Sequence, residues 1–138
     1  MAGPPFALEG LDHVVLLVRG MAEAERFYRE VIGCTVEGRL PEYGMMQLRA
    51  GAALIDLVDI ASPQGAWGRP EAEGGRNMDH VCIATGPWDE AAMRGHLAGH
   101  GVEIIEEGIR SGARGDGLSF YVSDPSGNTI ELKGPPGE

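Results

Sequence analysis

The second half of the chain repeats the first, and this repeat limits the possible folds more than any other feature of the sequence. The run Leu11-Asp12-His13-Val14 recurs as Met78-Asp79-His80-Val81. Further along each half, Ile55-Asp56-Leu57 recurs as Ile130-Glu131-Leu132. Such a repeat indicates one supersecondary unit that occurs twice. We therefore predict two similar modules, each with a histidine near its start and a carboxylate near its end.

Each half has the pattern of one strand, one helix and three further strands. Apolar residues at helical spacing lead to Gly33 in the first half and to Gly101 in the second, where glycine suits a left-handed helix end. This order predicts an α+β fold built from two tandem βαβββ modules. Strands are predicted at residues 11–18, 34–38, 45–48, 53–59, 78–84, 102–107, 118–122 and 128–133.

The segment between the halves is rich in glycine and proline, which indicates a connecting loop. The expected organisation has five parts, in chain order. These are an N-terminal extension over residues 1–10, a first module over 11–60, a connecting loop over 61–77, a second module over 78–133 and a C-terminal tail over 134–138.

The last two strands are joined by a short turn at residues 124–128, Asp-Pro-Ser-Gly-Asn. This turn predicts a three-residue hairpin loop with Gly127 in the left-handed conformation, which pairs Tyr121 with Glu131. Because side chains alternate across a sheet, Glu131 faces away from the aliphatic side of its strand. A carboxylate in mid-strand is costly to bury without a cation or hydrogen-bond donors, so Glu131 requires a partner. The expected core face comprises Phe120, Val122, Ile130 and Leu132.

Four polar residues interrupt apolar strands at positions related by the repeat: His13, Asp56, His80 and Glu131. Their neighbours are the aliphatic residues expected to pack under the helices, so the polar side chains point to the opposite face. Packing of the modules with pseudo-twofold symmetry would bring the four together. Each alone has another explanation, a hydrogen-bonded core histidine or a solvated carboxylate. Together they predict a site for one divalent ion, with Zn, Ni, Co, Mn and Fe all open.

Three further features are candidates for binding. The glycine-rich stretch 108–117 is either a flexible hairpin loop or a lid whose Arg110 and Arg114 hold an anionic group of the substrate. Tyr121, across from Glu131, either donates a hydrogen bond to a bound oxyanion or serves in packing. His96 and His100 form a second histidine pair at helical spacing, but no carboxylate is placed to complete a metal site there.

The charge and composition of the chain limit the kinds of partner that we expect it to bind. Eleven basic against 21 acidic residues give a net charge of −10, which argues against nucleic acid and anionic membranes as partners. The longest run of large aliphatic residues, 14–18, is far shorter than the ~20 residues of a membrane span. Cys34 and Cys82 lie in apolar surroundings, so we expect both to be small core residues. We expect a cytoplasmic protein that acts on a small molecule.

These features together resemble the vicinal oxygen chelate superfamily, which includes glyoxalase I, bleomycin-resistance proteins, fosfomycin-resistance enzymes and extradiol dioxygenases. The resemblance implies an eight-stranded incomplete barrel around a metal ion, usually in a homodimer, with the ligands of each site supplied either by one chain or by both. The motifs that carry it are Leu11-Asp12-His13, the helix end at 27–33, Met78-Asp79-His80, His100-Gly101-Val102, the hairpin 124–128 and Ile130-Glu131-Leu132.

The resemblance also assigns roles to residues. His13, His80 and Glu131 match the metal ligands of the metal-dependent members, and Asp56 matches the additional carboxylate of glyoxalase I. Glu131 or Asp56 would then act as the base. Tyr121 and Arg114 would contact the substrate.

Departures from the family pattern limit the range of activities that we expect. The positions that hold glutathione in bacterial glyoxalase I are Leu17 and Ile60 here, and a threonine of the fosfomycin enzymes is Val15. The expected function is therefore that of a glyoxalase-like lyase or isomerase on a small oxygenated metabolite. An extradiol dioxygenase is the enzymatic alternative. A metal-free protein that sequesters cationic drugs, as bleomycin-resistance proteins do, is the alternative that the acidic charge favours.

Overall fold

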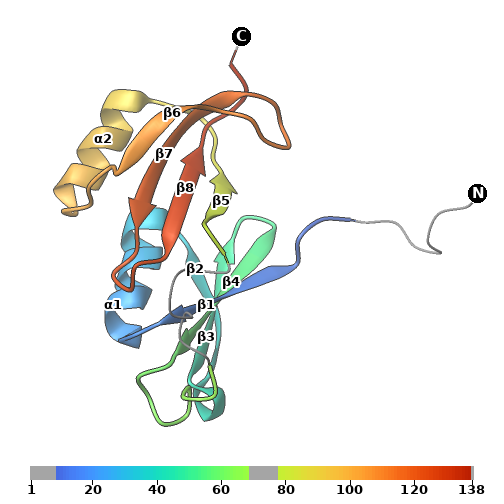
Figure 1. Cartoon of the computed structure of the whole chain (residues 1–138), viewed down its shortest axis with the longest axis vertical. Helices are drawn as coiled ribbons and strands as arrows, with labels where there is room; N and C mark the ends of the chain where they lie inside the picture. The colour runs from blue at the N-terminus through green and yellow to red at the C-terminus, as the bar shows by residue number, and fades with distance from the viewer. Residues whose placement is uncertain (1–8, 69–77, 138) are drawn as a thin grey trace, which may run out of the picture.

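A computed structural model describes residues 9–68 and 78–137 of the chain, which form two separate four-stranded sheets (Figure 1). The rest of the expected N-terminal extension and connecting loop, together with Glu138, lies outside the described residues. The first sheet has the order β1-β4-β3-β2 and contains β1 (His13–Val18), β2 (Thr35–Leu40), β3 (Met45–Ala50) and β4 (Ala53–Asp59). The second has the order β5-β8-β7-β6 and contains β5 (Val81–Ala84), β6 (Glu106–Arg110), β7 (Gly117–Ser123) and β8 (Thr129–Lys133).

The two sheets have the same topology. In each, the first strand is parallel to the last, and the other neighbours are antiparallel. The predicted α+β fold of two βαβββ modules is therefore confirmed. No hydrogen-bonded strand pair joins the sheets within the described part of the chain, so the barrel is not closed.

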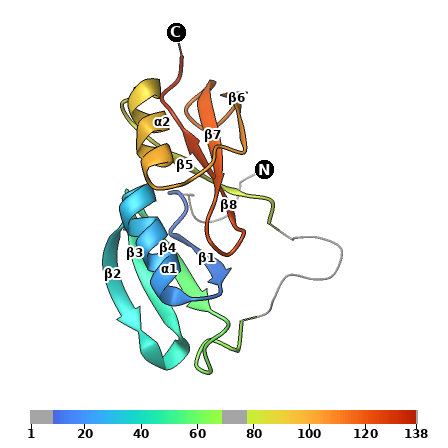
Figure 2. The ribbon, with the colours of Figure 1, turned by 90° about the vertical axis from the view of Figure 1, so that its left-hand side faces the viewer.

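One helical segment covers each sheet, and both lie along the same side of the molecule (Figure 2). In the first module, α1 (Met21–Arg26) continues as the π-helix η1 (Phe27–Ile32) and ends at Gly33 with a left-handed φ of 97°. In the second, α2 (Glu90–Gly99) begins at Asp89, whose side chain caps the backbone N–H of Ala92. A short 3-10 helix η2 (Pro41–Tyr43) links β2 to β3. None of the helices within the described residues is long and apolar enough to cross a membrane.

The helix-facing sides of both sheets share one hydrophobic core. Leu16 and Ile55 of the first module and Phe120 and Ile130 of the second belong to the same buried cluster. This packing turns the alternate residues of β4 and β8, which include Asp56 and Glu131, to the faces that the helices leave free.

The hairpin between β7 and β8 fastens the second module to the first. Its predicted geometry is confirmed, because Gly127 has a φ of 88° and Tyr121 pairs with Glu131. Tyr28 Oη donates a hydrogen bond of 2.7 Å to Asp124 Oδ2, and Asn128 Nδ2 donates one of 2.9 Å to the carbonyl oxygen of Leu17. Since both contacts join residues far apart in sequence, they fix how the two modules sit against each other.

Three expectations about the second module need correction. The predicted strand 78–84 begins only at Val81, which pairs with Ile130 of β8, so His80 precedes the strand. The strand predicted at 102–107 lies at 106–110, since the N–H of Val102 still bonds to the carbonyl of Leu97 and closes the helix end. Cys82, expected in the core, is exposed because it pairs with Glu131 and lies on the face of the second sheet that the helices leave free; Cys34 is buried as predicted.

Candidate metal centre

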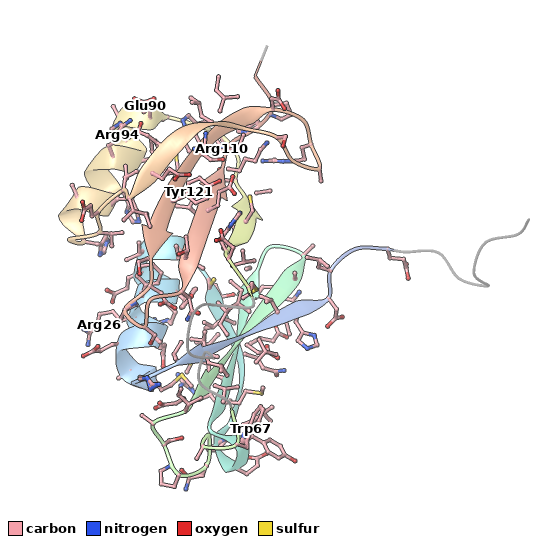
Figure 3. The ribbon with its side chains drawn as sticks, viewed as in Figure 1. Arg26, Trp67, Glu90, Arg94, Arg110 and Tyr121 are labelled. Carbon is pink, nitrogen blue, oxygen red and sulfur yellow. The ribbon has the colours of Figure 1, made fainter. Side chains whose placement is uncertain are left out.

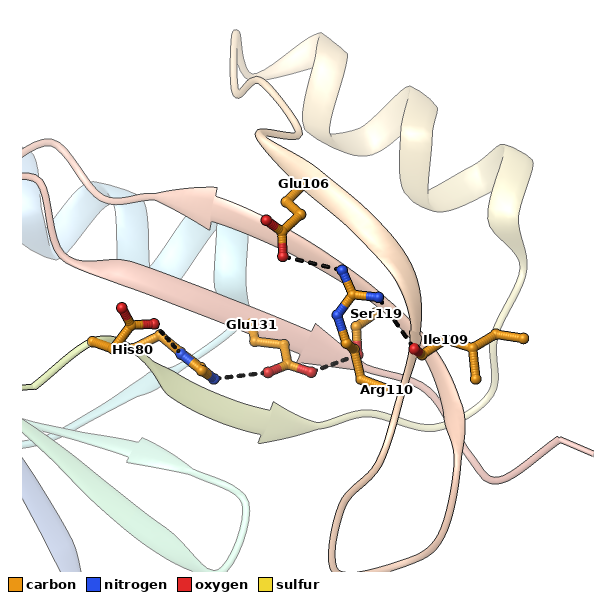
Figure 4. Close-up of polar contacts among 7 residues, drawn as sticks. His80, Glu106, Ile109, Arg110, Ser119 and Glu131 are labelled. Atoms are coloured by element: carbon orange, nitrogen blue, oxygen red, sulfur yellow. Dashed lines mark hydrogen bonds and ion pairs between the residues drawn. The ribbon is translucent and has the colours of Figure 1, made fainter.

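Glu131 is held in a buried position on β8 by groups from neighbouring segments (Figure 4). Its Oε2 accepts a hydrogen bond of 2.6 Å from Ser119 Oγ on β7, and its Oε1 lies 3.0 Å from His80 Nε2. Two ligand atoms that share one octahedral ion are also about 3 Å apart, given metal–ligand distances near 2.1 Å. His80 and Glu131 therefore form a pair, termed here the second half-site, with the spacing that a shared ion requires.

The surroundings of Glu131 favour its charged form. Burial alone would raise the pKa of Glu131, but hydrogen bonds from Ser119 and Tyr121 and the charge of His80 outweigh it and lower that pKa. Glu131 is thus in the ionised state that binds metal. Burial and the hydrogen bond to Glu131 raise the pKa of Tyr121, so its hydroxyl remains a donor. The Tyr121 ring also meets the His80 ring edge-on, with centroids 5.4 Å apart.

Each candidate histidine is oriented by the aspartate that precedes it in the sequence. His13 Nδ1 donates to Asp12 Oδ1 over 2.6 Å, and His80 Nδ1 donates to Asp79 Oδ2 over 2.7 Å. A carboxylate on one ring nitrogen fixes the tautomer and leaves Nε2 as the metal-binding atom, an arrangement common around metal ligands. The roles of Asp12 and Asp79 were not predicted from the sequence, although the repeated Asp-His dipeptide is a signal from which they could have been found.

Asp56 and His13 form the first half-site, on the open face of the first sheet. Asp56 is only 4% exposed, and its Oδ1 has no hydrogen-bond partner among the described residues. In the β1–β4 register, Val15 lies beside Asp56 and His13 lies one row away on the same face. The pKa of His13 is raised, mainly by its hydrogen bond to Asp12 and next by the negative charge of Asp56. A buried carboxylate oxygen without a donor is costly, and a cation would satisfy it.

The structure brings the four predicted ligands together as two pairs. Within the described residues, no three metal-binding side chains are close enough to hold one ion. The donors nevertheless fit a divalent metal, because both Nε2 atoms are free of the orienting aspartates and one Asp56 oxygen lacks a partner. Imidazole nitrogens with carboxylate oxygens suit Zn, Ni, Co, Mn or Fe(II).

The two arginines predicted to bind substrate occupy different surroundings. Arg110 lies over the Tyr121 ring, 5.5 Å from its centroid, and its Nη2 donates to Glu106 Oε2 over 3.0 Å (Figure 3). Arg114 instead donates from Nη2 to three backbone carbonyl oxygens, those of Thr85, Lys133 and Gly134, at 3.1, 3.0 and 3.1 Å. Arg110 therefore borders the second half-site, and Arg114 fastens the β6–β7 loop to the end of β8.

The second histidine pair is placed at the junction of the modules. The rings of His96 and His100 are 4.8 Å apart, and His96 Nε2 lies 2.9 Å from the carbonyl oxygen of Val31. That ring nitrogen is engaged with the backbone of the first module. The pair contributes no third ligand group within the part of the chain that the structure describes.

Comparison with known proteins agrees with this fold. Residues 10–132 match the family model described as the Glyoxalase/Bleomycin resistance protein/Dioxygenase superfamily. The chain belongs to this superfamily. The resemblance inferred from the sequence motifs is thereby confirmed.

Three relatives illustrate the range of the superfamily. The mitochondrial methylmalonyl-CoA epimerase of Bos taurus is 31% identical over 96% of this chain and 78% of its own length. Metapyrocatechase 2 of Cupriavidus necator is 28% identical over 96% of this chain, which spans only 35% of that longer protein. The crystal structure of virulence protein STM3117 from Salmonella typhimurium superposes with a TM-score of 0.72 at 26% identity, covering 94% of this chain and 99% of that one.

Proposed function

We propose that the protein is a metal-dependent enzyme of the lyase or isomerase type that transfers a proton on a small oxygenated metabolite. His13, His80, Glu131 and Asp56 are the proposed ligands of one divalent ion. The proposal rests mainly on the observation that both half-sites already hold their side chains in a state suited to binding metal. Each histidine has its Nδ1 on a neighbouring aspartate, and the buried Asp56 has an oxygen without a hydrogen-bond partner in the described structure.

Each side chain of the site has a separate role in the proposed reaction. When bound, a divalent ion supplies Lewis-acid stabilisation of negative charge on the substrate oxygens. Asp56 takes the proton from the neighbouring carbon and returns it, because Ser119 and His80 already engage both oxygens of Glu131. Tyr121 transfers its hydrogen bond from Glu131 to the substrate oxygen, and Arg110 over its ring borders the same face.

Deuterium exchange tests the proton transfer directly. Methylmalonyl-CoA is a suitable first substrate, since an epimerase named for it is similar to this chain. Enolisation removes the proton from the carbon beside the thioester, and Asp56, after exchange with the solvent, returns a deuteron to that carbon. Metal-loaded wild-type protein in D₂O should incorporate deuterium there, and Asp56→Asn should lower the rate by about 10²–10⁴, the usual contribution of a general base. Equal rates for wild type and variant would contradict the role of Asp56.

The separation of the two half-sites supports a homodimer with shared sites. Both β1 and β5, beside His13 and His80, are edge strands that pair on one side only within the described sheets. Next to them, Leu11 is 84% exposed and Met78 is 40% exposed. A second copy of the chain, related by a twofold axis, would cover these edges and complete each site with its own half-site.

Mixing two inactive variants distinguishes shared sites from sites within one chain. His13→Ala and His80→Ala each remove one ligand from every site. If sites are shared, each mixed dimer keeps one intact site, so random exchange should restore about a quarter of the wild-type metal sites. No restoration after confirmed subunit exchange would place each site within a single chain.

The similarity to metapyrocatechase 2 favours a dioxygenase as the second candidate function. Two histidines and one carboxylate also describe an Fe(II) site that leaves positions open for oxygen and substrate. Oxygen uptake with catechols by iron-loaded protein, absent with Zn or Ni, would establish this alternative. Drug sequestration, which the charge of −10 favours, would instead show as binding of a cationic aromatic drug by metal-stripped protein.

A further inference from the structure

Lys133 is the single lysine of the chain, whose other basic residues are all arginines, and it is buried. Only 4% of the residue is exposed. Its Nζ donates one hydrogen bond, of 2.5 Å, to the carbonyl oxygen of Gly115. No carboxylate oxygen among the described residues lies within 4.0 Å of Nζ. An ammonium has three donors and is costly to bury without a counter-charge, so Lys133 is incompletely satisfied.

Lys133 lies beside the second half-site. It is two positions beyond Glu131 on β8 and therefore shares its face of the sheet. Ser119 connects the two residues, because it pairs with Lys133 in the β7–β8 register and donates its hydroxyl to Glu131. A ligand held at Glu131 would thus have a cation within one row of the sheet.

Lys133 is covered by residues 111–116, termed here the glycine loop, whose backbone approaches it at Gly112 and Gly115. Gly112 passes directly over the lysine stem, since a Cβ at that position would lie 3.0 Å from Lys133 Cε. The loop supplies carbonyl oxygens and a further cation, Arg114, but no carboxylate that pairs with the ammonium. Two cations, Lys133 and Arg114, therefore lie together at the end of β8 in a strongly acidic protein.

The other two cations near this face already have partners. Arg110 is paired with Glu106, and Arg114 binds backbone carbonyl oxygens. Of these three cations, Lys133 therefore has the fewest partners and is the one that still needs an anion. We propose that Lys133 binds an anionic oxygen group of the substrate, a carboxylate or a phosphate, beside Glu131 and beneath the glycine loop. That the anionic group belongs to a substrate rests on the proposed function, whereas anion binding by Lys133 does not require the metal.

The single lysine allows a site-specific test on the wild-type protein. Protein labelled with [13C]lysine gives one lysine Cε signal in NMR spectra, and inorganic phosphate and malonate are titrated separately into metal-free samples. We expect a saturable shift with one of the two anions, which then identifies the group as phosphate or carboxylate. A Cε signal that neither anion moves would overturn the proposal.

Substitution provides the second readout. Lys133→Met keeps the length of the buried stem and removes the charge, and it should weaken binding of the effective anion at least tenfold by calorimetry, as expected for loss of a charged hydrogen bond of roughly 1.4 kcal/mol or more. Lys133→Arg keeps the charge and tests whether an amine is required. Binding that is unchanged in Lys133→Met would also overturn the proposal.

Metal content measured on the same samples separates the two proposals. Lys133→Met should retain the metal of the wild type, because Lys133 is not a proposed ligand. Anion binding without any metal uptake would refute the proposed function alone. Normal metal uptake without anion binding would refute the role of Lys133 alone.

Discussion

Replacing Asp56 by asparagine should stabilise the metal-free protein. The variant keeps the shape of the side chain and removes the charge of a buried carboxylate whose Oδ1 has no hydrogen-bond partner in the described structure. An unsatisfied buried polar group costs about 1–3 kcal/mol, and more if charged. Asparagine keeps a polar atom at this position, so only the part of the cost that comes from the charge is relieved, and the melting temperature of the metal-free protein should rise by roughly 4 °C for each kcal/mol of that part.

The same substitution should weaken stabilisation by metal. An ion at about 100 times its Kd adds roughly 2.7 kcal/mol to the stability of a protein that binds it. If loss of the Asp56 carboxylate lowers the affinity tenfold, about 1.4 kcal/mol of that gain disappears. Differential scanning calorimetry with and without metal should therefore show a variant that is more stable without metal and gains less from it.

Asp59→Asn is the matched control, since Asp59 ends the same strand with its oxygens fully engaged. Its Oδ1 accepts from the N–H groups of Gly20 and Ala61, and its Oδ2 accepts from that of Met21, all at 3.1 Å. Asp59→Asn should destabilise the protein equally with and without metal. If Asp56→Asn behaves in the same way as this control, the reasoning from the unpaired oxygen is refuted.

Three further predictions concern the rest of the fold. Tyr28→Phe removes the buried hydrogen bond to Asp124 and should lower the free energy of unfolding in urea by about 1 kcal/mol; an unchanged value would mean that this contact does not hold the modules together. Burial raises the pKa of the Cys34 thiol to about 11, so thiol reagents at pH 8 should modify it only after unfolding, and rapid native labelling would contradict its burial. The hydrogen bond from Arg39 holds the pKa of Glu25 below its ordinary value of 4.5, so this carboxylate stabilises the fold above pH 4.5 and the contribution disappears as pH falls through the lower folded pKa; Glu25→Gln should flatten the acid side of the stability curve, and an unaltered curve would refute the contribution.

Local patterns in the sequence were sufficient to predict the repeated modules and the final hairpin. The pairing of Tyr121 with Glu131 followed from turn chemistry at Gly127, because a glycine in the left-handed conformation fixes the register of the strands that it joins. Alternation along β8 then identified the face that Glu131 occupies. Both inferences depend on residues within about a dozen positions of one another.

Contacts between distant segments were not predictable in this way. The burial of Lys133 depends on a loop that returns over β8, and the backbone contacts of Arg114 depend on where that loop lands. No periodicity in the sequence encodes either contact. The arrangement of His13 and His80 in two half-sites depends on how the modules pack, which is fixed by contacts such as the one between Tyr28 and Asp124.

Elemental analysis of the purified, untagged protein tests the metal centre most directly. The proposal predicts about one equivalent of a divalent metal per chain, lost in His80→Ala and reduced or lost in Asp56→Ala. His100→Ala is the control, because it removes a histidine that lies outside both half-sites, and it should keep the metal. A wild-type protein that takes up no metal on reconstitution, or a His80→Ala variant that retains it, would contradict the account.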